Sequence, residues 1–197
     1  MKKIKYIEKL KPYLKKEYEN YRIIIKRIYE RYNEIVEENY EIEEMYIHTH
    51  ERIYPGIATF QVLLECGKSK EEAEVFVNEY LNKSVKRNLQ VLMNIPGLYR
   101  MTHIIVKRMV KRKYKEKLGF YIKWYETQRN ELRFDVIECP YNEICTHYHC
   151  QEIVKGYCDS NEICYKKKDK KISWFRTQTL EQGDECCDFR IIINKKV

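Results

Sequence analysis

The chain has 197 residues, of which 44% are hydrophobic and 35% are charged. That length suits one domain, and a chain with 6 glycines and 4 prolines is expected to be ordered and rich in helix. The formal net charge is +8, but basic residues occur throughout the chain, so we expect no nucleic-acid partner. The densest basic run, residues 100–117, is interleaved with apolar residues and predicts an amphipathic surface helix.

The N-terminal sequence lacks an apolar stretch of signal-peptide length, and nowhere do about 18 apolar residues follow one another. We therefore expect a cytoplasmic protein without a membrane partner. Cytoplasmic thiols are kept reduced, so the 8 cysteines are expected to be free thiols or metal ligands. All but one of them lie between Cys139 and Cys187.

The N-terminal half carries a helical pattern. Apolar residues recur at three- and four-residue steps from Ile4 to about Glu44, which predicts a long amphipathic helix with at most one break. Tyr54-Pro55-Gly56 predicts a turn that leads into an apolar segment.

A further helix is predicted after this segment. Ser69-Lys70-Glu71-Glu72 forms a capping box, in which a hydroxyl and a carboxylate bond amide groups that the helix leaves free. Pro96-Gly97 separates this helix from the basic run.

The pattern changes to period two in the C-terminal half. Residues 120–125 and 132–138 are aromatic or β-branched runs around a polar turn and predict a β-hairpin. Residues 172–180 and 187–193 predict a second hairpin around Gly183. In its last strand Cys187 alternates with apolar residues on one face, so its thiol is expected to point inward.

Cys139 is the cysteine with the clearest chemical setting. It follows a predicted strand and precedes Pro140, and proline is favoured in the first turn of a helix. The free amides and the dipole of a helix N-terminus favour a thiolate, which suits a nucleophile or a metal ligand. The alternative is a small apolar side chain at the end of a strand.

The remaining cysteines divide into two groups. Cys145, Cys150 and Cys164 are expected to be buried and structural, because a buried cysteine behaves as a small hydrophobic residue. Cys158 follows Gly156, a predicted helix terminator, and precedes Asp159, which is either a helix cap or a site residue.

Metal binding stays open at this point. The cysteines contain no Cys-x2-Cys pair, so a zinc finger or ribbon is not expected. A zinc site assembled from distant segments remains the alternative, with Cys139, Cys158, Cys187 and Glu152 as its ligands.

The histidines are weaker candidates. His147 and His149 lie among the cysteines, and at most one of them is expected to enter a site, because alternate residues of a helix do not face each other. His48 and His50 are expected on the surface.

An ordered set of short motifs runs through the C-terminal region. It consists of Phe134-Asp135-Val136, Cys139-Pro140-Tyr141, Tyr157-Cys158-Asp159 with Tyr165, Arg176-Thr177-Gln178-Thr179-Leu180, Gly183, and Cys187-Asp188-Phe189-Arg190. The set resembles the L-2-amino-thiazoline-4-carboxylic acid hydrolase family.

The resemblance implies an α+β fold, similar to vinyl-reductase-type small-molecule-binding domains, whose cysteines can hold zinc. We expect a helical N-terminal layer, residues 1–118, packed with a small antiparallel sheet, residues 119–197, that carries a cysteine-rich site. The two regions are expected to form one integrated domain.

The resemblance also implies hydrolytic opening of a cyclic C–N bond in a small carboxylated heterocycle. We expect Cys139 or Cys158 to be the nucleophile or to hold a zinc ion that activates water, and Glu152 or Asp159 to transfer protons. Cys187 completes the catalytic cluster. The residues expected to bind the substrate are Tyr141, Arg176, Thr177 and Asp188, with Arg176 pairing with the substrate carboxylate.

The alternative function is a non-enzymatic small-molecule-binding or sensor domain with a structural zinc bound by cysteines. It implies ligand binding without turnover. The sequence leaves open whether the chain is a monomer or a homodimer.

Overall fold

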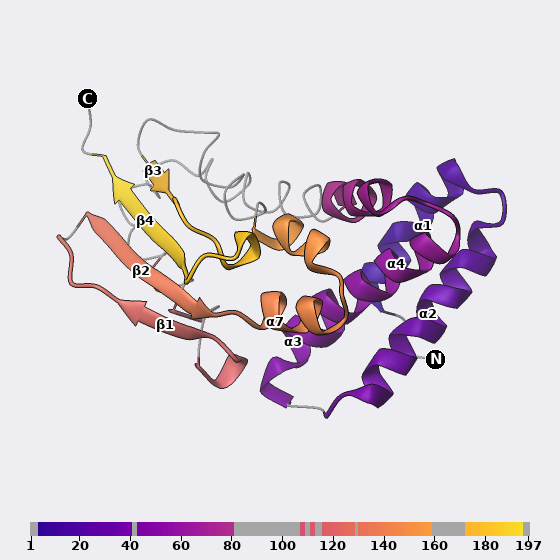
Figure 1. The fold of residues 1–197 in the computed structure, drawn as a ribbon, viewed down its shortest axis with the longest axis horizontal. Helices are drawn as coiled ribbons and strands as arrows, with labels where there is room; N and C mark the ends of the chain where they lie inside the picture. The colour runs from indigo at the N-terminus through magenta and orange to yellow at the C-terminus, as the bar shows by residue number, and fades with distance from the viewer. Residues whose placement is uncertain are drawn as a thin grey trace. The chain divides into compact units, whose positions relative to one another are not determined.

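The computed structural model describes residues 4–40, 43–80, 107–108, 111–112, 116–128, 130–158 and 172–194. It has the predicted α+β class, with helices and one four-stranded antiparallel sheet (Figure 1). The chain divides into two compact units. The helical unit comprises Met1–Tyr80 and Ile144–Ile153, and the sheet unit comprises Leu81–Glu143 and Val154–Val197.

The helical unit begins with two helices, separated by the single break that the prediction allowed. α1 spans Lys5–Glu17 and α2 spans Tyr21–Glu38, so the predicted break falls between them and the second helix ends before Glu44. Each helix buries one stripe, as its spacing predicts. The fully buried residues of these stripes are Ile7, Leu10, Leu14, Ile28 and Ile35.

The predicted turn at Tyr54-Pro55-Gly56 is wrong. The helical run there comprises η1 (Glu43–Met45), α3 (Tyr46–His48), the π-helix η2 (Thr49–Ile53) and α4 (Tyr54–Glu65). Pro55 lies in the first turn of α4, where a missing amide costs little. α4 is buried on most of its circumference, which marks it as the central helix of its unit.

The predicted capping box is confirmed. Residues 70–80 are helical, the Ser69 hydroxyl accepts a hydrogen bond from the Glu72 amide at 3.2 Å, and the Glu72 carboxylate accepts one from the Ser69 amide at 2.8 Å. Pro96-Gly97 lies outside the described residues. Of the basic run, residues 107–108 and 111–112 are described, and they are helical and exposed.

Both predicted hairpins are present in the sheet unit. The strands are β1 (Tyr121–Trp124), β2 (Glu131–Glu138), β3 (Ile172–Phe175) and β4 (Cys187–Ile193), in the order β1-β2-β4-β3 (Figure 1). Gly183 ends the turn η6 (Leu180–Gln182) with a φ of 89°, a conformation that favours glycine.

One face of the sheet is apolar and buried. Phe134 pairs with Phe189 and Val136 with Cys187 across β2 and β4, and all four side chains are buried. Cys187 therefore points inward, as predicted. Aromatic rings continue the row, because Trp124 lies 5.0 Å from Phe134 between ring centroids.

The chain leaves β2 through α7 (Pro140–His147) and η5 (Gln151–Ile153). Residues 154–158 are again helical, so Gly156 lies inside a helix and the predicted helix end there is wrong. None of the helices in the described parts of the chain has the length and hydropathy needed to span a bilayer.

Candidate functional site

Three cysteines from separate segments come together in the sheet unit. Cys139 connects β2 to α7, Cys158 belongs to the helical residues 154–158, and Cys187 is the first residue of β4. The thiols of Cys139 and Cys187 both act electrostatically on Cys158. We call Cys139, Cys158 and Cys187 the thiol cluster.

Burial keeps two of these thiols protonated. Burial, followed by the neighbouring Cys139 and Cys187, raises the pKa of Cys158 to about 12, although the Arg176 guanidinium acts in the opposite direction. Burial also raises the pKa of Cys187, which is opposed by a hydrogen bond from the Leu180 amide to its sulfur at 3.3 Å. Both residues are therefore neutral thiols at pH 7.

Cys139 has a different setting. Like Cys158 it is half-buried, but it directly precedes α7, as predicted, and its carbonyl accepts a hydrogen bond from the Glu143 amide at 3.0 Å. The amides of the first turn of α7 lie next to it, and such groups favour a negatively charged sulfur.

A carboxyl group that the sequence analysis missed lies one helical turn from Cys139. Glu143 is exposed, but partial desolvation by the neighbouring chain, and then the charge of Glu138, raises its pKa, whereas the Cys139 backbone amide acts in the opposite direction. A carboxyl with a raised pKa can donate and accept a proton closer to neutral pH. An acidic residue four positions after Cys139, in the first turn of a predicted helix, was the available signal.

Arg176 places a cation beside the thiol cluster. It directly follows β3, and its guanidinium carbon lies 5.9 Å from the centroid of the Phe189 ring. Its positive charge partly opposes the rise that burial causes in the pKa of Cys158 and of Cys187. The predicted anion-binding residue thus shares one region with the three thiols.

The Asp188 carboxylate is hydrogen-bonded to the chain segment that follows Arg176. The Asp188 carboxylate accepts bonds from the Thr177 amide and hydroxyl, both at 2.7 Å, and from the Gln178 amide at 2.6 Å. Burial alone would raise the pKa of Asp188, but these hydrogen bonds together hold it below the ordinary value. The carboxylate is therefore ionised at neutral pH.

Tyr141 lies in the core of the sheet unit. Its ring centroid is 4.9 Å from that of Tyr157 and 6.3 Å from that of Phe120, and its side chain is buried. A substrate contact of Tyr141 stays a prediction.

Of the two predicted proton-transfer residues, the structure describes Glu152. Glu152 belongs to the helical unit, where its carboxylate pairs with the Lys70 ammonium at 3.0 Å. Asp159 lies outside the described residues, as does Cys164.

The described residues do not form a metal site. Nowhere in the parts of the chain that the structure describes do three or more His, Cys, Asp or Glu side chains form a group that could hold a metal ion. The thiol cluster is thus close enough for electrostatic interaction without forming such a group.

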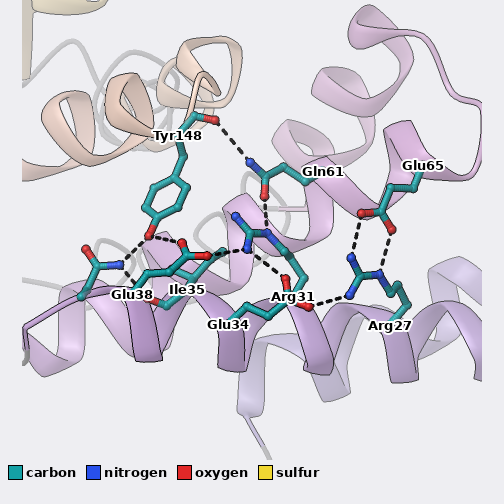
Figure 2. Close-up of polar contacts among 9 residues, drawn as sticks. Arg27, Arg31, Glu34, Ile35, Glu38, Gln61, Glu65 and Tyr148 are labelled. Atoms are coloured by element: carbon teal, nitrogen blue, oxygen red, sulfur yellow. Dashed lines mark hydrogen bonds and ion pairs between the residues drawn. The ribbon is translucent and has the colours of Figure 1, made fainter.

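The helical unit contains a separate polar network, drawn in Figure 2. The Arg31 guanidinium donates to Gln61 at 2.7 Å, to Glu34 at 2.9 Å and to Glu38 at 3.0 Å. The Tyr148 hydroxyl donates to Glu38 at 2.9 Å, so the network joins α2 and α4 to the segment after α7. These contacts stabilise the unit, and none of the predicted site residues belongs to them.

The predicted surface positions of His48 and His50 are wrong, because both side chains are buried. His50 stacks on Tyr46 with 4.4 Å between ring centroids, and its Nδ1 lies 2.8 Å from the Tyr32 hydroxyl. His50 lies in the π-helix η2, which leads into the buried helix α4, and a residue of a single amphipathic surface helix would instead have been exposed.

His147 and His149 belong to the helical unit and are both exposed. His149 has a φ of 54°, the left-handed conformation that commonly ends a helix.

The sequence matches one protein family. The family model described as L-2-amino-thiazoline-4-carboxylic acid hydrolase matches residues 46–191, a range that includes the thiol cluster and Arg176. No curated protein matches this chain.

Similar solved structures include H-NOX proteins of Shewanella oneidensis. An H-NOX domain in the Fe(II)CO state is 14% identical, covers 72% of this chain and 75% of its own, and gives a TM-score of 0.29. An H-NOX protein in the Fe(II)NO state is 13% identical, covers 84% and 89%, and gives a TM-score of 0.30. These scores are too low to support an argument about fold or function.

Proposed function

This chain belongs to the L-2-amino-thiazoline-4-carboxylic acid hydrolase family, and we propose that it hydrolyses a cyclic C–N bond in a small carboxylated heterocycle of the 2-amino-thiazoline type. The observation that carries the proposal is the grouping of Cys139, Cys158 and Cys187 beside Arg176 in the sheet unit. A substrate of this type needs both a nucleophile for its ring carbon and a cation for its carboxylate.

Arg176 binds the substrate carboxylate in this proposal. A guanidinium offers two parallel donors to a carboxylate and remains charged at any physiological pH. Its position over the Phe189 ring limits its freedom, which lowers the entropic cost of binding.

Cys139 is the nucleophile that the structure favours over Cys158. The pKa of Cys158, about 12, leaves almost no thiolate at neutral pH. Cys139 instead precedes the first turn of α7, where the helix amides stabilise a thiolate.

The reaction proceeds in two steps that together consume one water. The Cys139 thiolate adds to the ring carbon between sulfur and nitrogen, the bond from that carbon to the ring nitrogen breaks, and the nitrogen leaves as an amine after taking up protons. Water then adds to the same carbon, the bond to Cys139 breaks, and the thiolate returns. The product is an open-chain carbamoyl thioester that carries a free amine.

Glu143 transfers protons in this scheme. It lies one turn from Cys139 on the same helix, and its raised pKa suits a group that donates to the leaving nitrogen and then accepts from water. Asp159 and Glu152, the proton-transfer residues expected from the sequence, stay predictions.

The test is incubation of the purified protein with L-2-amino-thiazoline-4-carboxylate. Mass spectrometry should detect a product heavier by one water, and an amine reagent should detect a new primary amine. A new substrate-derived thiol would show that the C–S bond breaks instead. Bound substrate without any product would contradict the proposal and favour the small-molecule-binding module.

Variants assign the roles. Cys139→Ser is expected to abolish turnover, and Glu143→Gln to lower kcat by about 10²-fold or more, the usual range for general acid–base catalysis. Cys66→Ser and Glu126→Gln are the matched controls, because Cys66 lies in the helical unit and Glu126 is an exposed residue of the sheet unit that does not contribute to the raised pKa of Glu143. Full activity of Cys139→Ser would exclude this nucleophile.

A further inference from the structure

The backbone around Arg176 is fixed on both sides. On one side, Phe175 pairs with Arg190 as the last residue of β3 in its ladder with β4. On the other side, the Thr177 and Gln178 amides both donate to the Asp188 carboxylate. Arg176 lies between these two attachments, so its backbone has little freedom.

Three consecutive residues of β4 act on Arg176 or on the groups next to it. Cys187 belongs to the thiol cluster, Asp188 holds the segment after Arg176, and Phe189 lies beneath the Arg176 guanidinium. Successive side chains of a strand point to opposite faces of a sheet. Asp188 therefore acts on the chain from the face opposite to Cys187 and Phe189.

We propose that Asp188 is a positioning residue that fixes the Arg176 guanidinium over Phe189 and beside the thiol cluster, and so sets the preference for a carboxylated substrate. This inference rests on the proposed function, because it assigns the substrate carboxylate to Arg176. It replaces the direct substrate contact that the sequence suggested for Asp188.

Charge and hydrogen bonding support the indirect role. One carboxylate oxygen of Asp188 accepts two amide bonds, and the other accepts the Thr177 hydroxyl. A direct contact would also bring the Asp188 anion against the anionic carboxylate of the substrate, which is repulsive. The same anion is well placed to hold two amides and a hydroxyl, since hydrogen bonds to a charged acceptor are the stronger ones.

The first experiment is a double-mutant cycle in which kcat/KM and KM are measured. Asp188→Asn and Arg176→Met are assayed singly and together with L-2-amino-thiazoline-4-carboxylate. Asp188→Asn should lower kcat/KM by about 10- to 100-fold, mainly through KM, because a small misplacement of a binding group has effects of that order. The double variant should be no worse than Arg176→Met alone.

Independent effects of the two substitutions would overturn the inference, because they would mean that Asp188 acts by another route. A fall in kcat with unchanged KM would overturn it as well. Asp184→Asn is the matched control, since Asp184 accepts a bond from the Thr179 amide at 2.7 Å in the same connection but does not hold the residues next to Arg176. Its KM should stay within about twofold of the wild-type value.

A second measurement does not depend on turnover. The rate at which phenylglyoxal modifies Arg176 is followed by peptide mass spectrometry, together with hydrogen exchange of the Thr177 and Gln178 amides. In Asp188→Asn both rates should rise about 10-fold or more, whereas Asp184→Asn should leave Arg176 unchanged. Unchanged rates in Asp188→Asn would refute the positioning role, whereas raised rates in a protein without ring-opening activity would refute only the proposed function.

Discussion

Alkylation of Cys158 gives a quantitative test of the thiol assignments. An ordinary cysteine with a pKa of about 8.5 is roughly 3% thiolate at pH 7. Cys158, with a pKa of about 12, has a thiolate fraction about 3 × 10³-fold lower, or about 3.5 log units. The higher basicity makes each thiolate more nucleophilic, which recovers about 1.5 log units, so the net expectation is a reaction roughly 100-fold slower than that of a free thiol.

The assay is a time course with iodoacetamide at pH 7, with N-acetylcysteine as the reference thiol and peptide mass spectrometry to locate the label. Cys139, half-buried at the start of α7, should be labelled faster than Cys158. Unfolded protein in guanidinium chloride should lose the difference. Labelling of folded Cys158 at the rate of the reference thiol would refute the reasoning.

Three predictions concern stability, each measured by urea or thermal unfolding. Ser69→Ala removes a capping bond and should cost about 1 kcal/mol, and a stability equal to wild type would contradict the capping box. Ile28→Ala removes a fully buried side chain and should cost about 2–5 kcal/mol of unfolding free energy. A small loss would mean that the core closes over the space, and it would contradict tight packing of α2. Hydrogen bonds from Arg31 and then Tyr148 hold the pKa of Glu38 below its ordinary value. The stability that ionised Glu38 contributes is therefore present above its pKa in the unfolded chain and is lost as the pH falls through its pKa in the folded protein. Glu38→Gln should accordingly flatten the decline of Tm between about pH 5 and 3. An unchanged dependence of Tm on pH would contradict this role of Glu38.

Local signals in the sequence predicted most of the sheet unit. Alternating side chains gave both hairpins, and the inward position of Cys187 followed from its period-two relation to Phe189 and Ile191. The start of α7 followed from Cys139-Pro140, because proline suits the first helical turn. In these cases the determinants lie within a few residues of one another.

The errors arose where tertiary packing overrides local preference. Gly156 normally interrupts helices, yet it lies within a helical segment that is buried. Pro55 lies in the first turn of α4, where proline is tolerated, so its presence did not mark a turn. His50 stacks on Tyr46 of α3, and its burial also depends on Tyr32, which comes from α2. No spacing rule within one segment could have shown that contact.

The candidate site was predictable only in part. Cys139, Cys158, Cys187 and Arg176 were selected from motifs, and the structure brings them into electrostatic contact. The distinction between the thiols was not predictable, because the pKa of Cys158 depends on burial by the folded chain. Glu143 was missed because its proximity to Cys139 matters only once α7 is formed.

The most direct test of the proposed chemistry is a search for the covalent intermediate. The protein is mixed with L-2-amino-thiazoline-4-carboxylate, quenched in acid within milliseconds to seconds, and analysed as intact protein and as peptides. An adduct of one substrate mass on the peptide that contains Cys139, absent from Cys139→Ser, is the predicted result. Product formation by Cys139→Ser at the wild-type rate would contradict the account.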